Sequence, residues 1–485
     1  MIRRQSFYIV GVLLIILGFS MLFSVGCSLI YGDGDLIPLL QSIAVTITSG
    51  LILVIFFKSK DKKDLSTHDG FAVVTLGWIA IVIFSAFPFY FSGTLDYTNS
   101  FFEAMSGLTT TGATVLGHSS TLLIEDVPHG ILFWRSFTQF IGGMGIIVFS
   151  IAILPMLGMG GVQLFRAEVA GPVADKITPR VKQTAKLLWG IYVGFVLILC
   201  LILKIEGMSW FDAICHSFTT IATSGFSTKN ISIAAYGGLI QWTIIIFMFL
   251  AATNFSLHYY FIAKGKFEYY KDHEFRVYFG LCIIFSILFF INIVGTNKYQ
   301  TDLLSFRHSV FAAVSILTTT GFSTENFNEW PEMSKMLLFF LFFIGGSAGS
   351  TTGGMKIIRS ILVVKYLLYE VRKLLHPKGV FNITIGENTI DDNVVRATLG
   401  FYLFYILIFV FTAMVLSMTG LDVTTALTAS ASAIGNIGPG LGSIGPTDNW
   451  GHLSDFAKWL TSFCMLLGRL EIFTVVVLFS RSFWK

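Results

Sequence analysis

Runs of apolar residues recur along the whole chain, and short polar loops separate them. About 20 apolar residues in a helix cross the hydrocarbon core of a bilayer. The pattern therefore predicts an all-α, polytopic membrane protein with ten spans, the eighth of them interrupted. The spans are expected at residues 7–30, 38–57, 70–91, 131–155, 186–205, 239–263, 276–295, 336–369, 396–418 and 457–480.

The composition agrees with this interpretation. Hydrophobic residues make up 54% of the 485 residues and charged residues only 12%, whereas a soluble protein carries roughly twice that charged fraction. A soluble enzyme is excluded, as are the disordered, collagen-like and disulfide-framework classes. The net charge of +4 is too small to indicate nucleic-acid binding. The five cysteines lie singly in apolar stretches and indicate neither a metal site nor a disulfide framework.

The distribution of Lys and Arg predicts the orientation, because cytoplasmic loops are enriched in both residues. The N-terminal apolar run is long enough to span and has no clear cleavage site, so we interpret it as a retained first helix. Both termini are predicted to be cytoplasmic, in a multi-pass protein of the cytoplasmic (inner) membrane. The basic clusters that lie on this side are at residues 3–4, 58–63, 166–186, 264–271, 372–378 and 481–485.

Four shorter segments between spans do not fit as full crossings, at residues 101–114, 211–228, 307–324 and 425–440. Each combines a short helix-compatible run with a cluster of small residues. Aligning one glycine from each segment gives spacings of 113, 96 and 117 residues, and such a period defines a repeat. The aligned triplets are Thr110-Thr111-Gly112, Thr223-Ser224-Gly225, Thr319-Thr320-Gly321 and Asn436-Ile437-Gly438.

The period divides the chain into four units, each expected to contain a span, a pore helix, an extended segment and a second span. Two additional N-terminal transmembrane helices and a basic cytoplasmic loop precede these units in residues 1–69. The predicted fold is thus fourfold pseudo-symmetric around one central pore. The four units are expected at residues 70–165, 166–272, 273–380, which includes the interrupted helix, and 381–485.

The physics of such a unit favours an ion pathway. Bare backbone at membrane depth is tolerated only where protein buries it or where it lines water. Glycine allows positive φ and brings carbonyl oxygens close to one point, and rings of carbonyls can replace the hydration shell of a cation. The C-termini of the short helices point inward and add negative potential at the centre. Four re-entrant packing loops without an ion are the alternative.

At these residues the chain resembles the TrkH/KtrB/HKT superfamily of potassium transporters, which are fourfold repeats of a potassium-channel-like pore unit. The resemblance covers about residues 70–485, and the two additional N-terminal helices resemble the TrkH branch. It implies that the aligned triplets form a selectivity filter that binds K+. Glycine at all four central positions implies potassium rather than sodium. Asn436 and Ile437 depart from the pattern, since the other segments have Thr or Ser there.

The interruption of the eighth span consists only of Gly, Ser, Ala and Thr. These residues disfavour helix, and the polar ones need water or protein partners at membrane depth. The resemblance implies a gating loop at this place, below the third filter segment. A close helix contact through small residues is the alternative. The predicted gate contains Gly345, Gly346, Ser347, Ala348, Gly349, Ser350, Thr351, Thr352, Gly353 and Gly354.

Residues 345–349 also match the GxSxG motif of serine hydrolases. That motif requires a strand-to-helix turn, a histidine base and an oxyanion hole. No strand is predicted here, and His216 and His258 lie in another repeat. An intramembrane serine hydrolase is the competing class of function. Walker A and metalloprotease motifs are absent from the sequence, so no ATPase or zinc chemistry is expected.

Arg469 lies near the midplane of the last predicted span, where an ionisable residue is costly and is functional by default. The resemblance implies that it faces the pore below the filter, so we assign it to the gate. A structural pair with Glu471 is the alternative. Lys356 could act similarly or extend to the cytoplasmic surface.

Other charged residues lie near the pore segments. Arg135 and Arg307 are interpreted as interfacial anchors. Glu103, Asp212 and Asp422 lie near the starts of the pore segments, where they could attract cations or cap the short helices.

The sequence therefore predicts a protein that is not an enzyme and that takes up potassium through a gated, channel-like pore. A secondary cation symporter with alternating access is the alternative within transport, although such carriers use inverted repeats. The resemblance implies a homodimer and a cytoplasmic, TrkA-type nucleotide-binding regulatory subunit. No covalent cofactor is expected: K+ is the transported ion, and a nucleotide acts only through the regulatory partner.

Overall fold

Helices make up most of the chain, which confirms the predicted all-α class. The computed structural model describes residues 4–58, 67–117, 122–152, 181–296, 298–379, 381–386 and 388–483. In this part, six helices are long and apolar enough to cross a membrane, and two bent pairs meet the same criteria together. A short hairpin pairs β1 (Thr384–Ile385) with β2 (Asn388–Thr389).

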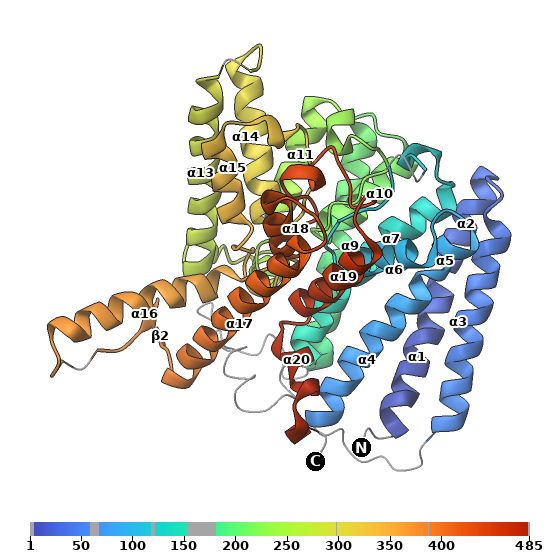
Figure 1. The fold of residues 1–485 in the computed structure, drawn as a ribbon, viewed down its shortest axis with the longest axis horizontal. Helices are drawn as coiled ribbons and strands as arrows, with labels where there is room; N and C mark the ends of the chain where they lie inside the picture. Colours follow the sequence, from blue (N-terminus) through green and yellow to red (C-terminus); the bar gives the residue numbers. More distant parts are fainter. Residues whose placement is uncertain are drawn as a thin grey trace.

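Two N-terminal spans pack together at one edge of the molecule (Figure 1). α1 (Arg4–Ser20) continues into α2 (Leu22–Tyr31), and α3 (Leu36–Phe57) packs along α1. The contact is close because Gly11 and Gly50 face each other: a Cβ on either would lie 2.8 Å from the carbonyl oxygen of the other. The predicted pair of additional helices is therefore present.

The first two repeats have the predicted order of a long helix, a short interior helix and a second long helix. The first repeat contains α4 (Thr67–Ser85), α5 (Phe87–Phe91), α6 (Tyr97–Leu108) and α7 (His129–Ala152). The second repeat contains α9 (Val181–Ile205), α10 (Trp210–Ile221), α11 (Gly238–Ala251) and α12 (Phe255–Lys264).

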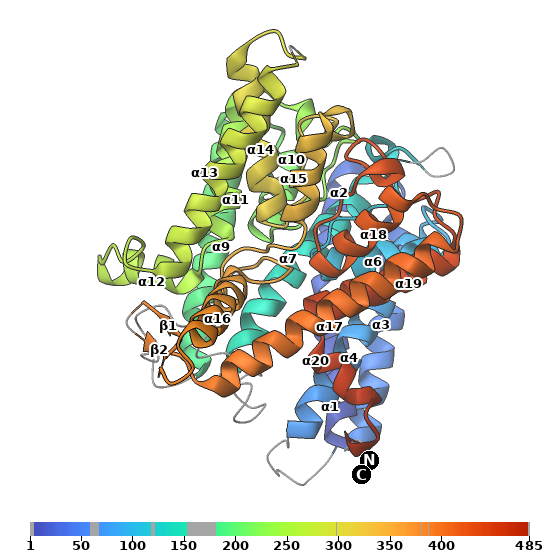
Figure 2. The same ribbon diagram turned by 60° about the vertical axis from the view of Figure 1, so that its left-hand side comes forward.

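The third and fourth repeats follow the same order, except that the last helix of each is divided into two. The third contains α13 (His273–Val294), α14 (Asp302–Leu317) and the divided helix formed by α15 (Glu332–Leu341) and α16 (Ile357–Leu375). α16 points away from the bundle and crosses the direction of α13 (Figures 1 and 2). The fourth contains α17 (Asp392–Ser417), α18 (Val423–Gly435) and the divided helix formed by α19 (Asp455–Arg469) and α20 (Phe473–Val476).

The four short helices α6, α10, α14 and α18 begin in the same way. In each, a side-chain oxygen of the N-cap residue accepts a hydrogen bond from the backbone N–H three residues later. Such caps satisfy donors that the first turn leaves free. Each start is therefore encoded locally. The N-cap residues are Asp96, Ser209, Thr301 and Asp422.

Two predicted continuous spans are wrong. The span at 239–263 is divided by a 96° bend between α11 and α12, where Asn254 accepts from Ser256 N and starts a new helix. The span at 457–480 is divided by a 109° bend between α19 and α20, where Glu471 and Ile472 have φ of 56° and 46°. Hydropathy does not detect either bend, because the two helices of each pair together are long and apolar enough to pass as one span. The predicted interruption of 336–369 is confirmed, between α15 and α16.

Three of the short helices, α6, α10 and α14, lie between repeats and connect them. Besides the long helices of their own repeats, α6 packs on α19, α10 on α7 and α14 on α11. Each of these three thus contacts the second long helix of the preceding repeat, as expected for a closed ring. The starts of α1 and α4 and the region after α20 lie at one end of the molecule (Figures 1 and 2).

Candidate functional site

The four aligned triplets have the same backbone conformation. Thr110, Thr223, Thr319 and Asn436 all have φ between 51° and 53°, and the glycine two residues later has φ between 78° and 103°. Positive φ is uncommon for a residue with a side chain, especially a β-branched one. Its recurrence at four aligned positions confirms that the segments are structural equivalents. The fourth segment departs in sequence but not in backbone.

The triplets surround one point. A Cβ built on Gly112, Gly225 or Gly321 would lie 2.0 Å from the carbonyl oxygen of the residue before the next aligned glycine, which is Ser224, Thr320 or Ile437. The ring closes because a Cβ on Gly438 would lie 2.7 Å from Thr111 O. Only glycine allows such close approach of neighbouring backbones. The predicted site residues are therefore brought together in cyclic order.

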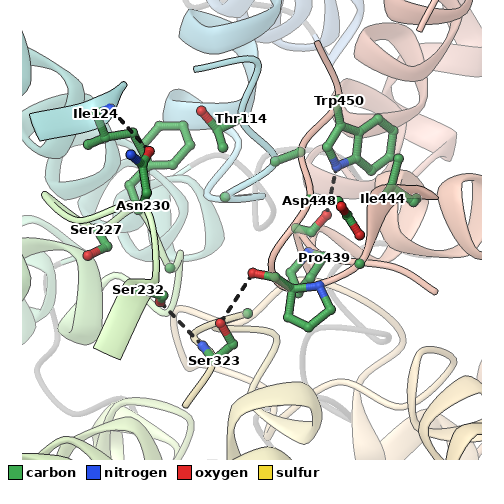
Figure 3. Close-up of a pocket in the computed structure, with 18 of the residues that line it drawn as sticks. Thr114, Ile124, Ser227, Asn230, Ser232, Ser323, Pro439, Ile444, Asp448 and Trp450 are labelled. Carbon is green, nitrogen blue, oxygen red and sulfur yellow. Dashed lines mark hydrogen bonds between the residues drawn. The ribbon is translucent and has the colours of Figure 1, made fainter. Parts of the chain in front are cut away.

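A cavity of about 70 Å³ lies above this ring, and all four glycines line it (Figure 3). The residues that follow the glycines form its wall. In Figure 3, the backbone N–H of Ser323 donates a hydrogen bond to Ser232 Oγ, and Trp450 Nε1 donates one to Gly438 O; the two distances are 3.3 Å and 3.2 Å. The cavity therefore leads directly to the backbone of the triplets. The other labelled wall residues are Thr114, Ile124, Ser227, Asn230, Pro439, Ile444 and Asp448.

The predicted gate loop lies directly against the other side of the ring. Thr351 Oγ1 is 3.2 Å from Thr223 Oγ1, and Gly353 N donates to Thr319 Oγ1 at 2.8 Å. A Cβ on Gly353 would lie 2.6 Å from the Cβ of Asn436. The loop thus contacts the left-handed residue of three of the four segments. Gly353, Thr351 and Thr352 are buried in this position.

The first part of the loop is held by other elements. Glu274, at the start of α13, accepts hydrogen bonds from Ala348 N at 2.9 Å and from Ile358 N at 3.0 Å. Ser347 N donates to Ala252 O, and Phe255 N donates to Gly349 O, so the loop is also bonded to the α11–α12 bend. One carboxyl group therefore joins the loop to the first turn of α16.

Arg469 contacts the predicted gate loop. Its guanidinium donates from Nη1 to Thr351 O and from Nη2 to Gly142 O, both at 2.9 Å, and the side chain is only 2% exposed. The alternative pair with Glu471 is wrong, because Glu471 binds Arg359 at 2.8 Å. The bend after α19 points the two side chains to different partners. Lys356 donates to Thr352 Oγ1 at 2.9 Å, so it contacts the loop.

Two further expectations are wrong. Arg135 is not an interfacial anchor: it is 2% exposed and pairs with Glu103 at 2.6 Å. Glu103 lies in the interior of α6 rather than at its start, and it also accepts from Thr114 Oγ1 and Val115 N. Arg307 is half-buried. Asp422 caps α18 as the alternative explanation proposed.

The residues of a serine hydrolase are not brought together. Ser347 lies in a loop between two helices rather than at a strand-to-helix turn. His216 bonds Ser227 Oγ and Asp212 O, and His258 bonds Tyr269 and Leu250 O. Neither histidine contacts the serine. The geometry that a GxSxG nucleophile needs is absent from the described residues around it.

The family model for TrkH, described as a cation transport protein, matches residues 39–485. The Trk system potassium uptake protein TrkH of Vibrio parahaemolyticus is 39% identical over 489 residues, covering 99% of both chains. The protein of the same name from Escherichia coli K12 is 39% identical over 482 residues, covering 98% of both.

The solved structures agree with this result. The crystal structure of the potassium transporter TrkH from Vibrio parahaemolyticus superimposes with a TM-score of 0.90 at 37% identity, covering 99% of both chains. Both the fold and the family resemblance expected from the sequence are confirmed.

Proposed function

Because the chain belongs to the TrkH family of cation transport proteins, we propose that it takes up potassium through the ring formed by the four triplets. Membership of a transport family also confirms that the chain is not an enzyme. The observation that carries the proposal is the closed cyclic contact of Gly112, Gly225, Gly321 and Gly438. Backbone oxygens arranged around one point can replace the water around a dehydrated monovalent cation.

The ring is the selectivity filter in this proposal, and the transported K+ binds at the triplets. The cavity above the ring is the outer entrance. Four short helices direct their C-terminal ends, which carry partial negative charge, towards the same place. The position suits a cation and disfavours an anion.

The loop at residues 345–354 is the gate. It contacts three of the four segments from the side opposite the cavity, so a hydrated ion leaving the ring would meet it. Arg469 acts as a latch, because it binds the loop at Thr351 O and the neighbouring repeat at Gly142 O. Opening requires the Thr351 contact to break.

The protein acts as a homodimer in the inner membrane, with both termini cytoplasmic, and a cytoplasmic TrkA-type nucleotide-binding subunit controls the gate. The relatives are named as parts of a Trk system, and a system implies a second component. The basic segment at residues 264–271 and the projecting helix α16 are the surfaces that such a partner would contact; the basic clusters predicted at 58–63 and 166–186 lie mostly outside the described residues.

Recording of currents from the full chain in planar bilayers, first in potassium and then in sodium, tests this proposal. Discrete openings that carry many ions, larger in potassium, are expected. Currents too small to resolve, together with potassium flux at a fixed ratio to a second ion, would instead indicate a stoichiometric carrier. Equal currents in the two cations would contradict the filter.

A further inference from the structure

A hydroxyl residue precedes three of the four glycines, Gly112, Gly225 and Gly321, and these three hydroxyl groups are supported in different ways. In the first segment, Thr111 Oγ1 bonds to Thr109 Oγ1 at 2.8 Å. In the third segment, Thr320 Oγ1 bonds to Thr318 Oγ1, also at 2.8 Å. Both contacts join the residue one position before the glycine to the residue three positions before the same glycine. They are internal to the segment.

The second segment cannot form this contact. The residue three before Gly225 is Ala222, which has no hydroxyl. The hydroxyl of Ser224, the residue before the glycine, lies 3.1 Å from Thr219 O of its own segment, and its closer partner, at 2.7 Å, comes from another element.

That partner is Gln139, from α7 of the preceding repeat. Its Oε1 accepts from Ser224 Oγ at 2.7 Å and from Phe226 N at 3.1 Å, and its Nε2 donates to Ser224 O at 2.9 Å. The side chain is fully buried. A single amide group thus binds the backbone on both sides of Gly225.

The face of α7 that carries Gln139 is built to approach this segment. One turn before it, Arg135 donates to Ser227 O at 2.8 Å and lies over the ring of Phe226 at 3.7 Å. One turn after it, Gly143 lets α7 come close to Ala222, since a Cβ on Gly143 would lie 2.9 Å from the Ala222 Cβ. Side chains four residues apart share one helix face.

The carbonyl group that Gln139 binds belongs to the ring itself. Ser224 O is the atom that would lie 2.0 Å from a Cβ on Gly112, so it marks the contact between the first and second segments. A hydrogen bond restrains a carbonyl group in direction as well as in distance. Loss of the amide would release this oxygen, and potassium-over-sodium selectivity depends on the field and spacing of such oxygens.

We propose that Gln139 is a positioning residue for ion selectivity, which replaces from outside the threonine pair that supports the first and third segments from within. This inference rests on the proposed filter.

The test measures rubidium uptake, and its competition by sodium, in potassium-uptake-deficient bacteria that produce the full-length protein. Gln139→Leu removes all three contacts at similar volume, and sodium is expected to compete about fivefold better, as expected for loss of roughly 1 kcal/mol of hydrogen bonding. Gln241→Leu is the matched control. Gln241 is a buried glutamine in α11, the equivalent helix of the second repeat, and donates to Tyr236 O at 3.0 Å. Its substitution should leave sodium competition unchanged.

A rescue variant separates positioning from general stability. Ala222→Thr with Ser224→Thr gives the second segment the Thr-Thr-Thr-Gly sequence of the first and third. Added to Gln139→Leu, these changes should restore selectivity. If Gln139→Leu does not reach the membrane, Gln139→Glu is measured instead, because it keeps the size and the acceptor oxygen but not the donation to Ser224 O.

The outcomes distinguish this inference from the filter proposal. If Gly112→Ser and Gly321→Ser alter selectivity but the Gln139 variant in the membrane does not, the role of Gln139 is contradicted and the filter stands. If the glycine variants also leave selectivity unchanged, the filter itself is contradicted. Equal loss of selectivity in Gln139→Leu and Gln241→Leu would show a nonspecific effect of instability and would also overturn the inference.

Discussion

Replacement of Arg469 by alanine should open the pore. The Thr351 O contact exists only while the loop lies under the ring, whereas the Gly142 O contact lies within the fixed helices. The closed state therefore loses one charge-assisted hydrogen bond, of about 1.5–3 kcal/mol, relative to the open state. Because 1.4 kcal/mol is a factor of ten, the open population should rise roughly 10- to 150-fold. The assay is rubidium uptake in cells that lack the regulatory subunit, normalised to the amount of protein in the membrane.

Two further variants define the mechanism. Arg469→Lys keeps the charge but not the planar group that reaches two carbonyls at once. If Arg469 holds the loop by hydrogen bonds, rubidium uptake by Arg469→Lys should be close to that of Arg469→Ala. If Arg469 acts only as an electrostatic barrier, uptake by Arg469→Lys should equal that of the wild type. Lys458→Met is the matched control, since Lys458 is a buried cation of the same helix that donates to Gly451 O. It lies 11 residues from Arg469, about 16 Å along the helix axis, and should not raise uptake. A stable Arg469→Ala protein with wild-type uptake would refute the latch.

Three other predictions follow from the same contacts. Gly112→Ser and Gly321→Ser should each lower the preference for potassium over sodium about tenfold, because the added Cβ would lie 2.0 Å from a ring carbonyl oxygen. Competition of sodium against rubidium uptake measures this preference. Gly280→Ser is the control, because a Cβ at Gly280 meets nothing within 4 Å. Deleting Thr351 and Thr352 should raise uptake without changing selectivity, and unchanged uptake by a folded variant would return the loop to a packing role. Glu103→Gln leaves Arg135 buried without its anion, so thermal unfolding in detergent should show a loss of about 3–5 kcal/mol; a melting temperature equal to wild type would contradict this.

The sequence predicts the ring well because its determinants are local. A short helix needs a cap, and a positive φ near a close contact needs glycine; both requirements leave recognisable residues at a fixed spacing. The interruption of the eighth span was predictable for the same reason, since ten small residues in an apolar span cannot remain an ordinary helix at little cost. The partners of the buried charged residues could not be predicted from the sequence. Arg135 meets Glu103 across 32 positions, and Arg359 meets Glu471 across 112, and no pattern in either neighbourhood specifies the pair.

Gln139 shows why sequence analysis misses residues that contact the ring from a neighbouring helix. A single glutamine in an apolar helix has no period and no motif, and its meaning depends on the absence of a hydroxyl at Ala222, 83 residues away. The useful signal is a comparison among repeats: Thr109 and Thr318 are aligned with Ala222, so the second segment lacks the pair of hydroxyl groups that the first and third contain. A buried polar group near that segment is then expected, because buried polar groups are hydrogen-bonded.

The fourth segment extends this comparison. Asn436 is aligned with Thr110, Thr223 and Thr319, and asparagine is among the residues that accept a left-handed conformation most readily. The substitution therefore preserves the backbone of the ring. It also changes the side-chain support, since Asn436 Nδ2 donates to Thr111 Oγ1 at 3.0 Å and to Met465 O at 2.9 Å. Asn436 thus joins the fourth segment to the first, where the ring closes. Pseudo-symmetry in this protein is kept by the backbone of the ring, while the contacts that hold each segment differ from repeat to repeat.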